Sequence, residues 1–199
     1  MYKGIAGSEG IGIGKVVIIE DHDITIETKH VPETDSEIAR LQEAIEKFVE
    51  ITNKMADKMD ETVGKKDADI LRGHIQMLQD PMIEEQISSL IIAEKITAEM
   101  AVDQVLEQTA EMFSQIPDEL LQQRATDFRD IKARMIKLLM GIEDVDISQV
   151  PAGTVLVAKD LTPSMTAGIK PENIEGILTE MGGKTSQLYW QEQWKFRRF

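Results

Sequence analysis

The spacing of hydrophobic residues changes twice along this chain. Between Thr34 and Met140, apolar side chains recur at steps of three and four residues, the spacing of one face of an amphipathic helix. On either side of this region, runs of β-branched residues such as Lys15-Val-Val-Ile-Ile19 and Thr154-Val-Leu-Val-Ala158 are typical of strands. The pattern therefore predicts a strand, then a block of helices, then a second region that contains strands.

The first predicted helix has a start signal and an unbroken apolar stripe. Thr34 and Glu37 match the capping-box pattern at its beginning. Gly64 interrupts the pattern at its end. The stripe consists of Ile38, Leu41, Ile45, Phe48, Thr52, Met55 and Met59. Such a stripe indicates the core of a helical bundle.

Caps and breaks divide the rest of the helical region. A second helix is predicted from Gly64 to Leu78, and Asp80-Pro81 then combines a good N-cap with the residue favoured at the first helical position. Thr97 can cap a third major helix, and Pro117-Asp-Glu119 opens a fourth. Residues 32–142 are therefore predicted to form a four-helix-type bundle.

After Gly141 the pattern returns to strands, predicted at residues 154–158 and 174–179. Between them, Thr162 can cap a short helix that begins at Pro163. The expected fold is α+β or α/β. In it the helical domain, residues 32–142, is inserted into a small, truncated β/α domain built from residues 1–31 and 143–186.

Composition limits the class of protein. The chain has 199 residues, of which 42% are apolar and 29% charged, as expected of a soluble globular protein. No apolar run approaches the ~20 residues that span a bilayer, and the N-terminus lacks the hydrophobic stretch of a signal peptide. The expected location is the cytoplasm. The absence of cysteine excludes disulfides and thiolate metal sites.

The net charge of −14 is concentrated in the helical region. Between Asp80 and Glu119 ten side chains are acidic and one, Lys95, is basic. Phosphate repulsion argues against a nucleic-acid partner, and a basic protein partner is favoured. An ordinary solvated acidic face remains the alternative interpretation.

The candidate chemistry lies near the C-terminus, where Asp160-Leu-Thr-Pro-Ser-Met-Thr-Ala167 is followed by Met181-Gly-Gly-Lys-Thr-Ser-Gln187. Gly182 and Gly183 can expose backbone N–H groups to an anion, beside Lys184. A Walker A loop is not expected, because its first glycine is replaced by Leu178. A simple turn after a strand is the remaining alternative.

These two blocks resemble the phosphohistidine loop of enzyme I, the phosphoenolpyruvate-protein phosphotransferase of the bacterial sugar phosphotransferase system. The resemblance covers residues 1–186 and implies the inserted helical domain described above. It implies a phosphate loop of Gly182, Gly183, Lys184, Thr185 and Ser186, with Thr166 orienting the phosphorylated ring.

The residue that should accept the phosphoryl group is changed. In the family a histidine follows Thr-Ser, takes the phosphoryl group from phosphoenolpyruvate and passes it to the carrier HPr; here that residue is Gln187. A neutral imidazole nitrogen is a competent nucleophile, whereas the lone pair of an amide is delocalised. We therefore expect no catalytic residue and no phosphorylation in this chain. No metal site is expected either, because the Mg²⁺ of the family binds in its C-terminal domain.

The resemblance also implies that the helical domain binds an HPr-like phosphocarrier. The positions that match the family's interface are His74, Met77, Leu78, Asp80, Arg124 and Asp127. Met77 and Leu78 can instead belong to the bundle core. Lys65, Lys66 and Arg72 place basic charge where some family members carry acids, which weakens the expected attraction for a basic carrier.

The tail, residues 187–199, departs from the family pattern and holds both tryptophans of the chain. This shift favours a frameshifted or prematurely ended reading frame over an evolved new tail. The predicted protein is a monomeric, inactive N-terminal fragment of enzyme I. The alternatives are a non-catalytic module that binds a carrier, and a fragment of a nitrogen-regulatory or dihydroxyacetone-type phosphotransfer protein.

Overall fold

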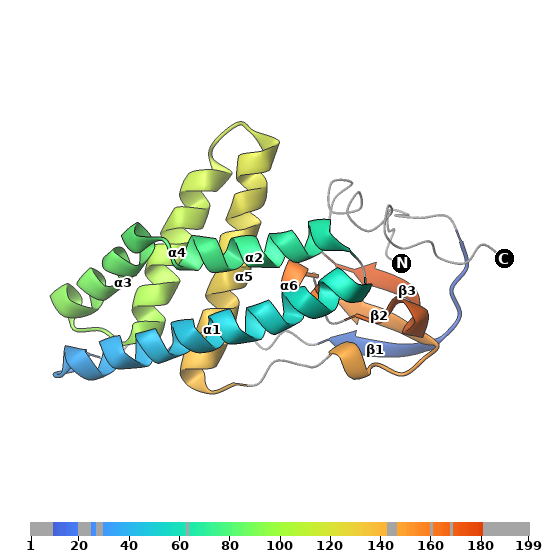
Figure 1. The fold of residues 1–199 in the computed structure, drawn as a ribbon, viewed down its shortest axis with the longest axis horizontal. Coiled ribbons are helices and arrows are strands. Elements are labelled where there is room, and N and C mark those ends of the chain that lie inside the picture. Colours follow the sequence, from blue (N-terminus) through green and yellow to red (C-terminus); the bar gives the residue numbers. More distant parts are fainter. Residues whose placement is uncertain are drawn as a thin grey trace. The chain divides into compact units, whose positions relative to one another are not determined.

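The computed structural model describes residues 10–19, 25–26, 30–62, 64–142, 147–159, 161–167 and 169–180. The chain divides into two compact units (Figure 1). The helical unit comprises Ile24–Asp144 and Thr162–Ala167. The sheet unit comprises Met1–Asp23, Val145–Leu161 and Gly168–Phe199.

Among its described residues, the helical unit contains five long helices and one short one. They are α1 (Thr34–Thr62), α2 (Lys65–Leu78), α3 (Pro81–Glu94), α4 (Ala98–Ser114), α5 (Glu119–Met140) and α6 (Pro163–Ala167). The predicted helical region is therefore confirmed. It holds one more full helix than a four-helix bundle, because the segment after Asp80-Pro81 extends over 14 residues as α3. None of the helices in the described ranges is long and apolar enough to span a lipid bilayer.

Side-chain caps start three of these helices as the sequence predicts. Asp80 accepts a hydrogen bond from the N–H of Met82 at 2.8 Å. Thr97 accepts one from the N–H of Met100 at 3.5 Å. At α5 the cap is Asp118, whose Oδ1 accepts from the N–H groups of Leu120 and Leu121. Such caps satisfy backbone donors that have no partner within the helix.

The capping box predicted for α1 is not formed by Glu37. Its Oε2 instead accepts a hydrogen bond from the N–H of Ala98, the first residue of α4, at 2.9 Å. The same oxygen pairs with Arg40 at 2.7 Å. Glu37 is buried and so ties α1 to the N-terminus of α4, where a carboxylate suits the helix dipole.

Residues of all five long helices, α1 through α5, form the main core of the helical unit. Its largest fully buried side chains include Phe48 of α1, Leu106 of α4 and Ile131 of α5. Arg134 is also buried and places its guanidinium 4.2 Å from the centre of the Phe48 ring. A second, smaller cluster joins α1, α2 and α6 through Ala56, Met59, Ala68, Leu71 and Ala167. The helix α6 therefore belongs to the helical unit, whereas the sequence suggested the β/α domain.

In the part of the sheet unit that the structure describes, three parallel strands pair in the order β1-β2-β3. They are β1 (Lys15–Ile19), β2 (Thr154–Ala158) and β3 (Ile174–Thr179). Short 3₁₀ turns, Ile147–Gln149 and Pro171–Asn173, precede β2 and β3. All three strands agree with the prediction from their β-branched runs. The parallel pairing of β1 with β2 requires a long connection between them, which the inserted helices provide.

Close backbone contact explains two of the glycines before β1. A Cβ atom on Gly14 would lie 2.3 Å from the carbonyl oxygen of Gly153, and one on Gly12 would lie 2.0 Å from that of Glu175. Only glycine therefore allows this segment to approach the ends of β2 and β3. Lys15 then begins the pairing by donating its N–H to Gly153 at 2.9 Å.

Candidate functional site

The phosphate loop predicted from the sequence lies outside the described residues. Gly182, Gly183, Lys184, Thr185, Ser186 and Gln187 all follow Glu180, where the described part of the chain ends. The backbone of Thr166 lies in α6, and its side chain is also outside the description. The described part of the candidate site consists of α6 and the face of α2 and α5.

A buried histidine lies at the centre of this region. His74 of α2 is 0% exposed and faces two carboxylates of α5. Its Nε2 lies 3.3 Å from Oδ1 of Asp127, and its Nδ1 lies 3.6 Å from Oδ2 of Asp130. Neither ring nitrogen makes a well-aligned hydrogen bond with any described residue. The ring therefore lies between α2 and α5 with a carboxylate of α5 near each of its nitrogens.

The carboxylate of Asp130 also holds α6. Its Oδ1 accepts a hydrogen bond from the hydroxyl of Ser164 at 2.7 Å, and its Oδ2 accepts one from the N–H of Ser164 at 3.3 Å. Both residues are buried, so these bonds form away from water. Buried carboxylates are stable only when their oxygens find such donors. Asp130 therefore joins α2, α5 and α6.

Thr162 caps the start of α6, as the sequence predicts. Its Oγ1 accepts a hydrogen bond from the N–H of Met165 at 3.4 Å and lies 3.0 Å from Oγ of Ser164. The segment that carries the Thr-Pro-Ser-Met-Thr block is thus capped by its own threonine and anchored to α5 by its serine. The anchoring to α5 was not predicted.

The partner-binding residues expected from the resemblance fall into two groups. His74 and Leu78 are fully buried, so a partner cannot contact their side chains, and this part of the expectation is corrected. Their apolar and electrostatic contacts hold α2 in the bundle instead. The other four residues, Met77, Asp80, Arg124 and Asp127, are at least partly accessible. We call these four residues the docking surface.

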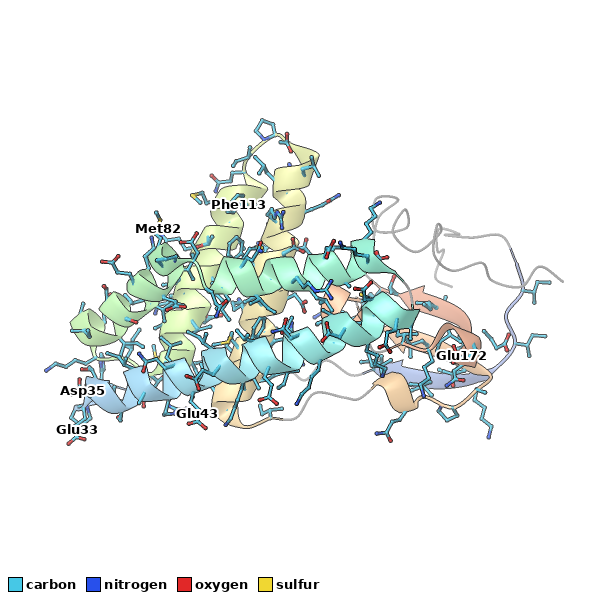
Figure 2. All side chains as sticks on the ribbon, viewed as in Figure 1. Glu33, Asp35, Glu43, Met82, Phe113 and Glu172 are labelled. Atoms are coloured by element: carbon cyan, nitrogen blue, oxygen red, sulfur yellow. The ribbon has the colours of Figure 1, made fainter. Side chains whose placement is uncertain are left out.

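Two helices meet at the docking surface. Arg124 of α5 reaches towards α2, where its Nη1 lies 3.6 Å from Sδ of Met77. The same nitrogen lies 3.5 Å from Oδ2 of Asp127 on its own helix. Asp80 caps α3 close to the end of α2, and Met82 follows it with 65% of its surface exposed (Figure 2). The docking surface therefore combines an accessible cation, Arg124, with the thioether of Met77, and the exposed Met82 follows Asp80 in the sequence, after Pro81.

The basic charge of Arg72 is neutralised within the helical unit. Its guanidinium lies 3.1–3.3 Å from the carboxylates of Asp57, Asp60 and Asp69. The hydrogen bonds that Arg72 donates to the carboxylates of Asp69 and Asp57 raise the pKa of its guanidinium. Because three acids surround this arginine, it weakens the attraction for a basic partner less than the sequence suggested.

The contact between Asp130 and Ser164 was not predicted from the sequence. One available signal was the spacing of Asp127 and Asp130, since residues three apart lie on the same face of a helix. Nothing local indicated that Ser164, 34 residues further along, would meet this face. Within the described ranges, no group of three or more histidine, cysteine or acidic side chains is arranged to hold a metal ion.

Two known protein families match this chain. The family described as "PEP-utilising enzyme, N-terminal" matches residues 3–124. The family described as "PEP-utilising enzyme, mobile domain" matches residues 150–188. The first match alone covers more than half of the chain, including α1–α4 and the start of α5.

Curated relatives agree with these families. The chain is 36% identical over 188 residues to the phosphoenolpyruvate-protein phosphotransferase of Haemophilus influenzae, covering 94% of this chain and 33% of that protein. It is 33% identical over 184 residues to the enzyme of the same name from Bacillus subtilis, covering 92% of this chain and 32% of that protein. The chain thus spans about a third of the length of these relatives.

Solved structures confirm the fold. An NMR solution structure of enzyme I superposes with a TM-score of 0.83 at 35% identity, covering 96% of this chain and 79% of that one. The N-terminal domain of a nitrogen-type enzyme I superposes with a TM-score of 0.64 at 22% identity, a likeness of fold alone, covering 91% of this chain and 74% of that one. The chain therefore belongs to the PEP-utilising enzyme family, as a relative of the N-terminal part of the phosphoenolpyruvate-protein phosphotransferases.

Proposed function

We propose that this chain binds a phosphocarrier protein of the HPr type on its docking surface. The family role is phosphoryl transfer from phosphoenolpyruvate through a histidine to HPr in bacterial sugar uptake. The observation that carries the proposal is the exposed contact between Arg124 and Met77, on the helices that the family resemblance assigns to carrier binding.

The chemistry of this contact suits a protein partner. The side chain of Arg124 is 51% exposed, so its N–H groups are accessible to a carbonyl or carboxylate of a partner. The thioether of Met77 is unbranched and adapts to the shape of an apolar side chain. Arginine and methionine are both enriched at the centre of protein interfaces.

The surrounding charge supports a basic carrier. The stretch from Asp80 to Glu119 contains ten acids and one base, and Arg72 is already paired with acids. An acidic surface increases the rate at which a basic partner associates, in a manner that depends on salt.

Phosphoryl transfer itself is not proposed for this chain as it stands. Gln187 occupies the position of the family's phosphohistidine, and its amide nitrogen is not nucleophilic. The consequence is a protein that binds a carrier without accepting its phosphoryl group. Such a protein would act as a carrier-binding module.

A carrier of the nitrogen-regulatory branch is the second candidate. The support for it is weaker, because its structural relative shares 22% identity and the phosphoenolpyruvate-protein phosphotransferases share 33–36%. Both carriers belong in the same experiment.

The test is an NMR titration of ¹⁵N-labelled HPr, and separately of a nitrogen-type carrier, with the unlabelled chain. We expect HPr to bind and Arg124→Glu to weaken binding at least about tenfold, as loss of a well-placed interface charge does. Arg129→Glu is the matched control, because Arg129 lies on the same helix, is similarly exposed and pairs with Glu107 instead. Failure of HPr to bind, or an equal loss in both variants, would refute the proposal.

A further inference from the structure

The buried ring of His74 lies between two carboxylates without a tight bond to either of them. Its Nε2 lies 3.3 Å from Asp127, and its Nδ1 lies 3.6 Å from Asp130. Ordinary N–H···O bonds measure about 2.7–3.2 Å, so both contacts are longer than a well-formed bond. A small shift of the ring towards one carboxylate shortens that contact and lengthens the other. The ring therefore has two alternative positions, each of which favours one of the two carboxylates.

The two carboxylates lead to different parts of the helical unit. Asp127 faces Arg124 of the docking surface, whose Nη1 lies 3.5 Å from its Oδ2. Asp130 is buried and holds α6 through Ser164. The oxygen of Asp130 that faces the ring of His74, Oδ2, is the same oxygen that accepts the N–H of Ser164 at 3.3 Å. His74 and Ser164 therefore compete for one acceptor.

We propose that His74 is a positioning residue that couples the docking surface to α6. When a partner draws Arg124 away from Asp127, that partly buried carboxylate loses a cation and attracts the ring instead. Oδ2 of Asp130 is then left to Ser164, and the bond from the Ser164 N–H becomes shorter. Loss of the Asp127 carboxylate has the opposite effect, because the ring then moves towards Asp130 and shares Oδ2 with Ser164.

This coupling connects two parts of the candidate site. One end is the docking surface, and the other is α6, which contains Thr166, the residue that the family resemblance places beside the phosphorylated ring. All the side chains in this series of contacts belong to the helical unit. Only the use of the coupling as a response to a carrier rests on the proposed function; the contacts themselves do not.

The backbone amide of Ser164 reports the coupling in a ¹⁵N-labelled chain. We expect Arg124→Ala to move its N–H signal downfield and to slow its hydrogen exchange several-fold, because its hydrogen bond shortens. We expect Asp127→Ala to move the signal upfield and to speed exchange. Arg129→Ala is the matched control and should leave the signal in place, because Arg129 lies on the same helix, is 46% exposed and pairs with Glu107.

Removal of the ring nitrogens separates coupling through His74 from the direct field of the altered charges. His74→Phe keeps a flat ring in α2 without nitrogen atoms. In this background we expect Arg124→Ala and Asp127→Ala to leave the Ser164 signal where His74→Phe alone places it. If His74→Phe does not fold, the ring ¹⁵N signals of His74 in the two single variants replace this test, and both variants should change them.

Shifts of the same sign in Arg124→Ala and Asp127→Ala would overturn the inference. Shifts that persist in the His74→Phe background, or unchanged ring signals of His74, would do the same. Unlabelled HPr added to the labelled chain should move the Ser164 signal in the same direction as Arg124→Ala. Binding of HPr without this change would overturn the inference and leave the proposed function intact. If HPr does not bind, the proposed function fails, and the variants alone decide the coupling.

Discussion

Asp130 shows how one side chain can connect three helices. Its carboxylate faces the ring of His74 on α2 and accepts two hydrogen bonds from Ser164 on α6. A buried charge of this kind is tolerated because donors surround it. Removing one donor leaves the carboxylate short of a partner away from water, which costs more than the bond itself contributes.

Ser164→Ala should therefore destabilise the protein by about 1–3 kcal/mol and speed hydrogen exchange in α6. Urea unfolding and amide exchange measure the two effects. Ser114→Ala is the control, because the Ser114 hydroxyl donates to the carbonyl of Glu111 on the exposed surface of α4. Equal stability of the two variants would show that α6 does not depend on Asp130.

The ion pairs of Glu107 are expected to make the free energy of unfolding depend on pH. Burial raises the pKa of Glu107, but hydrogen bonds from Lys132 and Arg129 outweigh it and hold the pKa below its ordinary value of 4.5. A lowered pKa in the folded state means that the ion pairs stabilise the fold above pH 4.5 and that this stability is lost as pH falls through the folded pKa.

Glu107→Gln should thus cost about 0.5–1 kcal/mol at pH 7, and the difference from the unaltered chain should shrink as pH falls below 4.5. Denaturant midpoints measured across pH test this. Glu111→Gln is the control, because the Glu111 carboxylate makes no ion pair within the described ranges. A stability difference between Glu107→Gln and the unaltered chain that increased as pH fell would contradict the lowered pKa of Glu107.

At the scale of elements, backbone contact determines where β1 can lie. The segment before β1 passes so close to β2 that a single methyl group on Gly14 would meet the carbonyl oxygen of Gly153. Helices α4 and α5, by contrast, associate through side chains such as Leu106 and Ile131, which can adjust by small rotations. The sheet is therefore more sensitive to added atoms than the bundle.

Gly14→Ala should displace β1 and break the hydrogen bond from Lys15 to Gly153. Faster amide exchange at Lys15 and Val17 is the expected signal. Gly176→Ala provides the comparison within the same sheet, since a Cβ there would lie 3.9 Å from Val155, an ordinary contact. If both alanine variants kept β1 equally protected, the close approach would not constrain the strand.

At the scale of the whole molecule, the proposed carrier-binding module carries Gln187 at the position where the family resemblance expects the phosphohistidine. If Gln187 is the one defect, then a histidine at this position should restore phosphoryl acceptance from a phosphorylated HPr. The reason is that imidazole nitrogen is nucleophilic at neutral pH and forms a phosphoramidate that can be passed on.

Gln187→His should therefore gain acid-labile ³²P label from phospho-HPr, whereas the unaltered chain stays unlabelled. Gln191→His, four residues further along the tail, tests whether any histidine nearby suffices. Label on the unaltered chain would refute its inactivity. Label on neither histidine variant would show that Gly182–Ser186 does not act as a phosphate loop here.

Local patterns were sufficient to predict the elements. The three-and-four spacing, the caps at Asp80 and Thr97 and the β-branched runs each involve residues close in sequence, so they act before any tertiary contact forms. The inserted helical region followed from the order of these elements. The residues of the docking surface came from family resemblance, and two of the six expected side chains proved to be buried.

What the sequence by itself determined is thus the order and type of the elements; the absence of the family's histidine at Gln187 stays a prediction from the resemblance. Only the tertiary structure decided that Glu37 accepts a hydrogen bond from the first residue of α4 and that α6 packs in the helical unit. It also decided that Asp130 lies between His74 and Ser164. The physical reason is that caps and periodicity depend on neighbours along the chain. The partners of Glu37 and Asp130, by contrast, lie 61 and 34 residues away along the chain, and packing brings them together.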